Sequence, residues 1–356
     1  MDWGFKLVTS MQILSLVRAS TWKSKAAFQS TLLNPKSAAI FRSRISAGLW
    51  TSPSRGGLRA FDTLSMSARM PSEGYEVAKG LCADVIPVPV LNDNYAYLLV
   101  DRESRMAACI DPAEPEKVIK AAKDHNVTIS ALLCTHKHWD HSGGNEAMKK
   151  MIPNLEVVSS AYEDDVPAMT LALKDQECFT LGSLSVKALH TPCHTRGHII
   201  FFVSDTKMGC KDGGAPVLFS GDTLFIGGCG RFFEGDASQM AHALQDVVGS
   251  LPGETRVFCG HEYTVSNLQF AASVEPENAD VAKKLAWSRE ILRTGGFTVP
   301  STLDEELLHN PFMRITVPSV QVATGAKDGV EVMARLRTMK NDFRPPPETA
   351  SRFPKL

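Results

Sequence analysis

A run from His136 to His141 holds three histidines and one aspartate, and it comes directly after the apolar stretch Ile129 to Cys134. A short apolar run of this kind, bounded by polar residues, predicts a buried strand. Open α/β layouts collect ligands on the loops that leave strand ends. Imidazole nitrogens and carboxylate oxygens are the donors that zinc and similar divalent metals prefer. The run therefore favours a fold in which a buried strand delivers metal ligands from its end.

The spacing within the run indicates two metals. His136 and His138 are two residues apart, so on an extended segment they point the same way. Asp140 and His141 come one turn later and can serve a second point in space. One metal rarely takes four ligands from so short a stretch. Chance clustering of histidines on a solvated loop is the alternative, and the density of donors argues against it.

More candidate donors follow in order along the chain. His194, Asp222 and His261 each come after a short apolar or β-branched run, as expected for a side chain delivered at a strand end. Glycine or proline stands close to each of them and permits tight backbone near a metal. These three residues are the candidates to complete a two-metal site.

The order T-H-x-H-x-D-H, a lone histidine, G-D and then G-H-E-Y resembles the metallo-β-lactamase superfamily, and within it the hydroxyacylglutathione hydrolases, also called glyoxalase II. The metal motif by itself indicates only the superfamily. The narrower resemblance runs from about residue 84 to about residue 345 and depends on further phrases: Asp93-Asn94-Tyr95, Gly228-Cys229-Gly230, Val274-Glu275-Pro276-Glu277-Asn278, Pro300-Ser301-Thr302 and Asn310-Pro311-Phe312-Met313-Arg314.

The resemblance implies an α/β (α+β) fold, a metallo-β-lactamase-like αββα sandwich with a C-terminal helical domain. The residue patterns agree, since strands predominate before residue 264 and helix-favouring segments after it. A strand interrupted by prolines is expected over 84–91, near a sheet edge. We expect a metal-binding domain over 80–264, a mostly helical glutathione-binding domain over 265–345, and a tail over 346–356.

The resemblance also implies a ligand set. It places His136, His138 and His194 on one metal and Asp140, His141 and His261 on the other, with Asp222 bridging the two. Water held between the metals is expected to provide hydroxide as nucleophile. Asp140 and Asp222 are then the catalytic carboxylates. Zinc is the expected metal, with iron and manganese as alternatives, because such donor sets accept all three.

The implied reaction converts S-D-lactoylglutathione to glutathione and D-lactate, the second step of methylglyoxal detoxification. For the glutathione thioester the resemblance implies five binding residues: Arg231, Phe233, Tyr263, Arg337 and Lys340. Arg337 and Lys340 share a helix face, and a solvated basic helix end is the alternative for them. Arg231 stands where the family often has lysine, and Phe233 where some members have tyrosine, which removes one hydroxyl.

Two other functions stay open. One is a mononuclear-iron sulfur dioxygenase acting on glutathione persulfide, and the other is a low-activity regulatory relative of the same fold. The full set of donors favours an active two-metal enzyme over both of these alternatives. The departures at Arg231 and Phe233 keep the regulatory alternative in view.

Residues 1–70 differ from the rest in charge. They hold ten Lys and Arg against Asp2 and Asp62, a charge of +8, so with −1 overall the remainder carries −9. An acid-poor, Arg- and Ser-rich leader predicts a transit peptide. We expect a mitochondrial protein, with a plastid or a cytosolic form starting at Met66 or Met70 as alternatives.

The same composition bears on partners. The acidic remainder argues against nucleic-acid binding. The sequence has no apolar run long enough to span a membrane. Nothing in the sequence reports the oligomeric state, and a monomer is the expectation.

Overall fold

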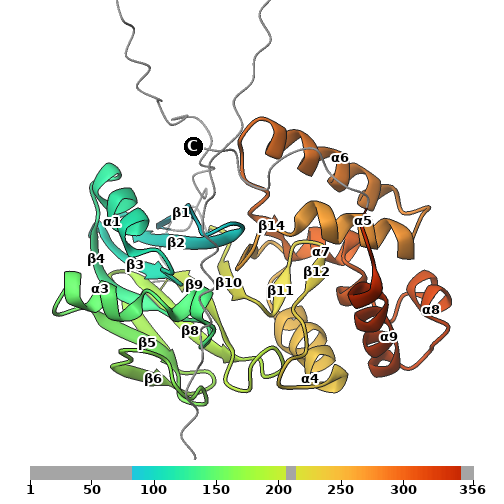
Figure 1. Cartoon of the computed structure of the whole chain (residues 1–356), viewed down its shortest axis with the longest axis horizontal. Helices are drawn as coiled ribbons and strands as arrows, with labels where there is room; N and C mark the ends of the chain where they lie inside the picture. Colours follow the sequence, from blue (N-terminus) through green and yellow to red (C-terminus); the bar gives the residue numbers. More distant parts are fainter. Residues whose placement is uncertain (1–81, 206–213, 346–356) are drawn as a thin grey trace, which may run out of the picture. The chain divides into compact units, whose positions relative to one another are not determined.

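Two six-stranded sheets pack face to face, with helices on both outer sides (Figure 1). The computed structural model describes residues 82–205 and 214–345. The predicted leader 1–70, the tail 346–356 and most of the glycine-rich segment 207–216 lie outside these ranges. None of the helices within them is long and apolar enough to cross a membrane.

The first sheet follows the order of the chain. Its strands are β1 (Ala83–Val90), β2 (Asn94–Asp101), β3 (Met106–Ile110), β4 (Thr128–Leu133), β5 (Glu156–Ser160) and β6 (Leu171–Leu173). β1, β2 and β3 are antiparallel neighbours, and β3 to β6 are parallel. β1 lies at the edge, as its prolines predict.

The second sheet has the order β14 (Ser301–Thr302), β13 (Arg256–Cys259), β10 (Val217–Gly221), β9 (Ile199–Asp205), β8 (Leu184–His190) and β7 (Cys178–Leu181). Only β10 and β13 pair in parallel. A separate hairpin joins β11 (Leu224–Phe225) to β12 (Gly228–Cys229).

Helices cover the two outer faces. α1 (Pro115–Asp124) and α3 (Asn145–Met151) lie on the first sheet, and α4 (Ala237–Ala241) with the helical turns η1 (His242–Val247) and η2 (Val248–Ser250) lies on the second (Figure 1). The C-terminal part contributes α5 (Thr264–Val274), α6 (Ala279–Arg293), α7 (Leu303–His309), η3 (Pro311–Met313), α8 (Pro318–Thr324) and α9 (Gly329–Asp342).

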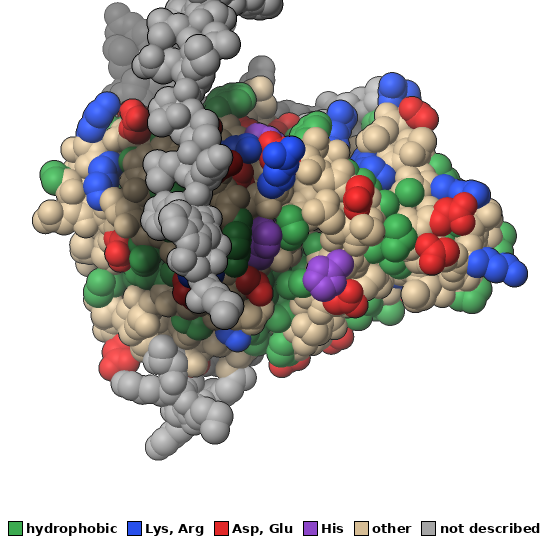
Figure 2. Space-filling model, turned by 90° about the horizontal axis from the view of Figure 1, so that it is seen from below, with side chains coloured by type: hydrophobic (Ala, Val, Ile, Leu, Met, Phe, Trp, Pro, Cys, Tyr) green, Lys and Arg blue, Asp and Glu red, His purple; other side chains and the backbone are tan. Residues whose placement is uncertain are grey.

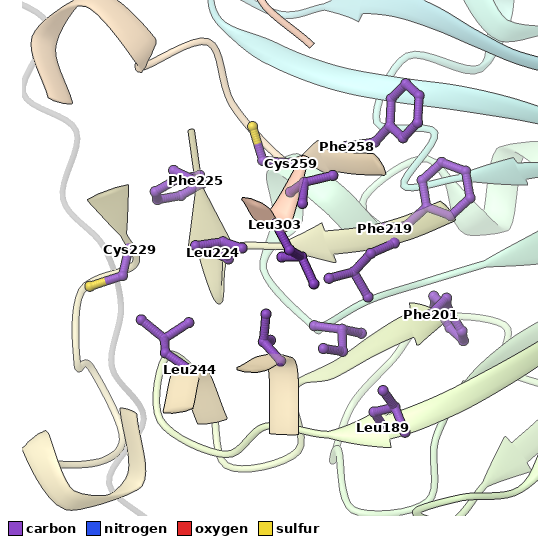
Figure 3. Close-up of a cluster of buried hydrophobic side chains, with 14 of the residues drawn as sticks. Leu189, Phe201, Phe219, Leu224, Phe225, Cys229, Leu244, Phe258, Cys259 and Leu303 are labelled. Carbon is purple, nitrogen blue, oxygen red and sulfur yellow. The ribbon is translucent and has the colours of Figure 1, made fainter. Parts of the chain in front are cut away.

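β2 shows how the layers are held together. Tyr95, Tyr97 and Leu99 belong to the core between the sheets, whereas Ala96, Leu98 and Val100 belong to the core under α1 and α3. Successive side chains of a strand point to opposite faces, so one fully apolar strand serves two cores. Figure 3 shows side chains of the core on the second sheet, from Leu189 and Phe201 to Phe258 and Leu303.

Candidate metal centre and the adjoining pocket

The candidate ligands lie on loops that leave strand ends. His136 and His138 follow β4, and at Trp139 the chain enters the one-turn helix α2 (Trp139–Ser142), which carries Asp140 and His141. His194 lies between β8 and β9, and His261 comes two residues after β13. Asp222 follows Gly221, the last residue of β10. The change from extended chain to helix after His138 separates the ligands of the run into two groups.

The first group consists of His136, His138 and His194. Nδ1 of His138 lies 3.0 Å from Nε2 of His136 and 3.0 Å from Nε2 of His194, so three ring nitrogens converge on one point. His136 is fully buried, and burial lowers its pKa well below the usual value. The ring is therefore neutral, which is the form that binds a metal.

The second group consists of Asp140, His141 and His261. Nε2 of His141 lies 3.2 Å from Nε2 of His261, and Oδ2 of Asp140 lies 3.5 Å from the latter nitrogen. Burial alone would lower the pKa of His261, but Asp222 and Asp93 outweigh it and raise the pKa to about 10. A metal that binds here must displace that proton.

Asp222 lies between the two groups. Its Oδ2 is 3.4 Å from Nε2 of His194 in the first group and 3.4 Å from Nε2 of His261 in the second. Burial alone would raise its pKa, but the charges of His261 and His141 hold the pKa well below its usual value. Asp222 is thus an ionised carboxylate that faces both groups.

The donors fit divalent metals. Oδ1 of Asp222 is buried and has no hydrogen-bond partner among the described residues, and a Cβ at Gly260 would collide with it. A buried carboxylate oxygen without a hydrogen-bond partner calls for an explanation, and an ion provides one. Five imidazoles and two carboxylates in such close contact suit zinc, iron or manganese.

Further groups hold the ligands from behind. Oδ2 of Asp111 lies 3.0 Å from Nδ1 of His141 and also accepts a 2.7 Å hydrogen bond from the Thr135 hydroxyl, which in turn lies 3.0 Å from Nδ1 of His136. Oδ1 of Asp93 lies 3.0 Å from Nδ1 of His261. Such partners fix the ring orientation and tautomer of a ligating histidine.

Three ligands that are not held by Asp93 or Asp111 have other partners. The Asn94 amide donates to Oδ2 of Asp140 at 3.0 Å. The backbone N–H of Asp222 donates to Nε2 of the fully buried His198 at 3.1 Å. Nδ1 of His194 lies 3.0 Å from the carbonyl of Arg231. His198 therefore holds the backbone of a ligand, Asp222.

Glu262 accepts hydrogen bonds from three other residues, which favours a structural role over that of a general base. The Tyr95 hydroxyl, at 2.5 Å, and the Thr298 hydroxyl, at 2.7 Å, both donate to its Oε2, and the backbone N–H of Thr264 donates to its Oε1. These partners tie β2, the start of α5 and the segment before β14 together below His261.

A pocket of about 300 Å³ adjoins the metal groups. Two of its lining residues contact His261. The Tyr263 ring stacks on the His261 ring with 4.7 Å between the ring centroids, and the centroid of the Phe225 ring lies 5.9 Å from that of His261. Four of the five expected substrate residues line the pocket. The lining residues are Phe225, Cys229, Arg231, Tyr263, Ser266, Asn267, Arg337, Lys340, Asn341, Phe343, Arg344 and Pro345.

Two cations of the pocket, Arg337 and Lys340, are partly desolvated. Arg337 is 8% exposed, and its guanidinium donates to the carbonyls of Cys229, at 3.1 Å, and Gly230, at 3.4 Å, so α9 is joined to the β11–β12 hairpin. Nζ of Lys340 donates to the Ser266 carbonyl at 2.9 Å. Burial and the charge of Arg337 lower the pKa of Lys340 to about 7. A solvated helix end is therefore excluded for both side chains.

Phe233 has a different position from the other four substrate candidates. It does not line the pocket, and its ring lies 5.1 Å from that of His194 and 5.9 Å from that of His138. The side chain is 60% exposed.

Figure 2 shows one face of the molecule, where histidine side chains reach the surface beside hydrophobic ones and acidic and basic groups are interspersed.

Known proteins resemble both parts of the chain. Residues 101–261 match the metallo-β-lactamase superfamily model, and residues 262–343 match the model of the hydroxyacylglutathione hydrolase C-terminus. The cytoplasmic hydroxyacylglutathione hydrolase of Arabidopsis thaliana is 46% identical over 261 residues, which cover 73% of this chain and 99% of that protein. A hydroxyacylglutathione hydrolase-like protein of Gallus gallus is 48% identical, with 73% and 90% covered.

Solved structures agree on the fold. The crystal structure of ETHE1 from Myxococcus xanthus is 22% identical with a TM-score of 0.51, and the match covers 74% of this chain and 92% of that one. A metallo-β-lactamase from Staphylococcus aureus is 21% identical with a TM-score of 0.50 and covers 73% and 70%. The expected αββα metallo-β-lactamase fold is confirmed.

Proposed function

Because this chain belongs to the hydroxyacylglutathione hydrolase family of the metallo-β-lactamase superfamily, we propose that it is a dinuclear metal-dependent thioester hydrolase. Its proposed substrate is S-D-lactoylglutathione, and its products are glutathione and D-lactate, in the second step of methylglyoxal detoxification. The observation that carries this proposal is the pair of donor groups joined by Asp222 beside a cationic pocket.

The proposed ligands of the first ion are His136, His138 and His194, and those of the second are Asp140, His141 and His261, with Asp222 shared. Zinc is the proposed metal, with iron and manganese as alternatives. Two bound divalent ions supply a nucleophile from water at neutral pH and stabilise the charge that develops on the thioester carbonyl. No serine or cysteine nucleophile is needed.

The chain itself supplies orientation and charge. Asp222 and Asp140 are the catalytic carboxylates, and Asn94 fixes the position of Asp140. The carboxylates of glutathione bind to the cations of Arg231, Arg337 and Lys340. Tyr263 lines the same pocket and stacks on His261, so the pocket extends to the metal ligands. This arrangement holds the acyl end of the substrate at the metals, and positioning of that kind accounts for a large share of many rate enhancements. Phe233 is proposed to cover the acyl side of the site.

The remaining parts of the proposal concern the whole chain. Residues 80–264 act as the metal-binding domain and residues 265–345 as the glutathione-binding domain. Residues 1–70 act as a transit peptide to the mitochondrion, and the protein is a monomer. The basic, acid-poor composition of residues 1–70 supports their role as a transit peptide.

Metal analysis and a thioester assay on one purified sample test the function. We expect two divalent ions per chain and hydrolysis of S-D-lactoylglutathione, with little hydrolysis of an acyl thioester that lacks the glutathione carboxylates. One iron per chain with oxygen uptake on glutathione persulfide would support the dioxygenase instead. Two metals without turnover would support a regulatory relative.

A further inference from the structure

Lys137 lies between two proposed ligands of the first metal, His136 and His138, but its side chain leaves the metal and enters an ion-pair cluster. Its ammonium lies 3.3 Å from Oε1 of Glu163 and 3.0 Å from Oε1 of Glu234. The backbone carbonyl of Lys137 accepts a 2.7 Å hydrogen bond from the Ser142 hydroxyl. Lys137 is thus held at both its backbone and its side chain.

Glu163 connects this lysine with the loop of His194. It comes from the segment between β5 and β6 and is only 5% exposed. The hydroxyl of Thr195, the residue after His194, donates to Oε2 of Glu163. Gly197 lies so close to the backbone of Glu163 that a Cβ there would collide with it. Glu163 therefore fixes the His194 loop against the first sheet.

Glu234 connects the same lysine with Phe233. Its Oε2 accepts a 2.9 Å hydrogen bond from the backbone N–H of Arg196, and its own N–H donates to the carbonyl of Cys193 at 3.1 Å. The residue before it is Phe233, whose ring faces His138 and His194. Glu234 thereby places Phe233 over the first group of donors.

We propose that Lys137, Glu163 and Glu234 form a charged clip that positions the His136/His138/His194 metal site and the Phe233 ring above it, and that Lys137 is the positioning residue common to both. The inference rests on the proposed metal assignment. The clip joins the loop after β4, the loop after β5, the β8–β9 loop and the loop after β12. The second donor group depends instead on Asp93 and Asn94. Asp111 serves both groups, His141 directly and His136 through Thr135.

The charges explain why one lysine matters. Glu163 is buried and Glu234 is about one-quarter exposed, with 26% of its side chain accessible. Removal of the ammonium leaves two carboxylates facing each other across a partly desolvated gap, and an unpaired buried charge is costly. The chain relieves that cost when the loops move apart. The two segments that would part carry Glu163, which holds the His194 loop through Thr195, and Glu234, which follows Phe233.

The test compares Lys137→Met with Lys137→Arg, and with Lys120→Met as matched control, because Lys120 pairs with Asp124 on the exposed face of α1. Each metal-free protein is titrated with Co²⁺, and the two binding steps are followed by the visible spectrum and by competition with a chelator. We expect Lys137→Met to weaken one of the two steps by about 10- to 100-fold, the range for groups that orient metal ligands, and to leave the other unchanged. Lys137→Arg should restore it, and Lys120→Met should match the wild type.

Glu234→Gln separates the two arms of the clip. Because the Glu163–Lys137 pair remains, both Co²⁺ steps should stay close to those of the wild type. The KM for the glutathione thioester should rise severalfold at nearly unchanged kcat, because Phe233 loses its anchor.

Wild-type and Lys137→Met proteins with the same two Co²⁺ affinities would overturn this inference and leave the proposed function standing. Equal weakening of both steps by Lys137→Met, without rescue by arginine, would overturn it too. A wild-type protein that binds fewer than two metals would overturn the proposed function, and this inference with it.

Discussion

In the donor groups, three histidines have their Nδ1 atom held by another residue. His141 is held by Asp111, His194 by the carbonyl of Arg231, and His261 by Asp93. In the adjoining pocket, by contrast, Arg337 and Lys340 donate to backbone carbonyls and, within the described part of the chain, form no ion pair with a carboxylate. The first region is fixed before a ligand arrives. The second contains cations whose charge a carboxylate ligand would stabilise.

This difference implies that the two regions control different kinetic constants. Groups that form the reacting centre act on the transition state, so their loss lowers kcat. Groups that hold a distant part of the substrate equally in ground and transition states appear in KM. The experiments below test this division, beginning with the largest expected effect.

Asp222→Ala should abolish hydrolysis, with a fall in kcat of about 10³-fold or more, because stabilisation by the metals amounts to several kcal/mol. The same variant should hold less than the full metal complement, since Asp222 faces both donor groups. Activity and metal content are measured on the same sample. Near-normal turnover with two bound metals would remove Asp222 from its bridging role.

Lys340→Ala should raise KM for glutathione thioesters by about 10- to 100-fold, because a charge-assisted hydrogen bond contributes about 1.5–3 kcal/mol. Its kcat should change much less, whereas His138→Ala should collapse kcat. Arg337→Ala should also raise KM, but it loosens the β11–β12 hairpin as well. Lys327→Ala, at an exposed lysine before α9, is the control. A wild-type KM in the Lys340 and Arg337 variants, with full metal occupancy, would show that the glutathione site is misplaced.

The pH dependence of substrate binding should reflect Lys340. Its pKa of about 7 means that the ammonium is present below pH 7 and lost above it, so kcat/KM for the anionic thioester should fall as pH rises. The fall due to this group should reach about tenfold between pH 6 and pH 8. Lys340→Arg keeps its charge over this range and should remove that part of the fall. An unchanged profile in Lys340→Arg would assign the pH dependence to another group.

Removal of residues 1–70 should leave both regions intact, with kcat, KM and metal content close to those of the full chain. The reason is the change near residue 71 from acid-poor, basic composition to ordinary globular sequence. An insoluble or inactive truncated protein would show that the leader contributes to the fold. Fusion of the leader to a fluorescent reporter tests the compartment separately, and a diffuse cytosolic signal would argue against mitochondrial targeting.

Sequence predicted the long elements well and the short ones poorly. The strands β1 and β4 and the helices α6 and α9 are long enough to be recognised. The strands β6, β7, β11, β12 and β14 and the helices α2 and α8 were not predicted. Most of these are only two to four residues long, and neighbouring segments rather than their own pattern determine their pairing.

The site divides in the same way. The donor residues can be recognised from their chemistry and spacing, whereas the residues that orient them cannot. Asp93 and Asp111 precede and follow ordinary strands in the sequence, and only the packing of β2, β3 and β4 brings them to His261 and His141. The burial of Arg337 was equally invisible, because a basic residue near a helix end usually faces solvent.

Asp111 has a consequence for how the protein acquires its metals. One carboxylate orients His141 directly and His136 through Thr135, so a single side chain serves ligands of both ions. Loss of this carboxylate would release a ligand of each proposed ion at once. A change at Asp111 should therefore weaken both metal-binding steps, whereas a change at Lys137 should weaken only one.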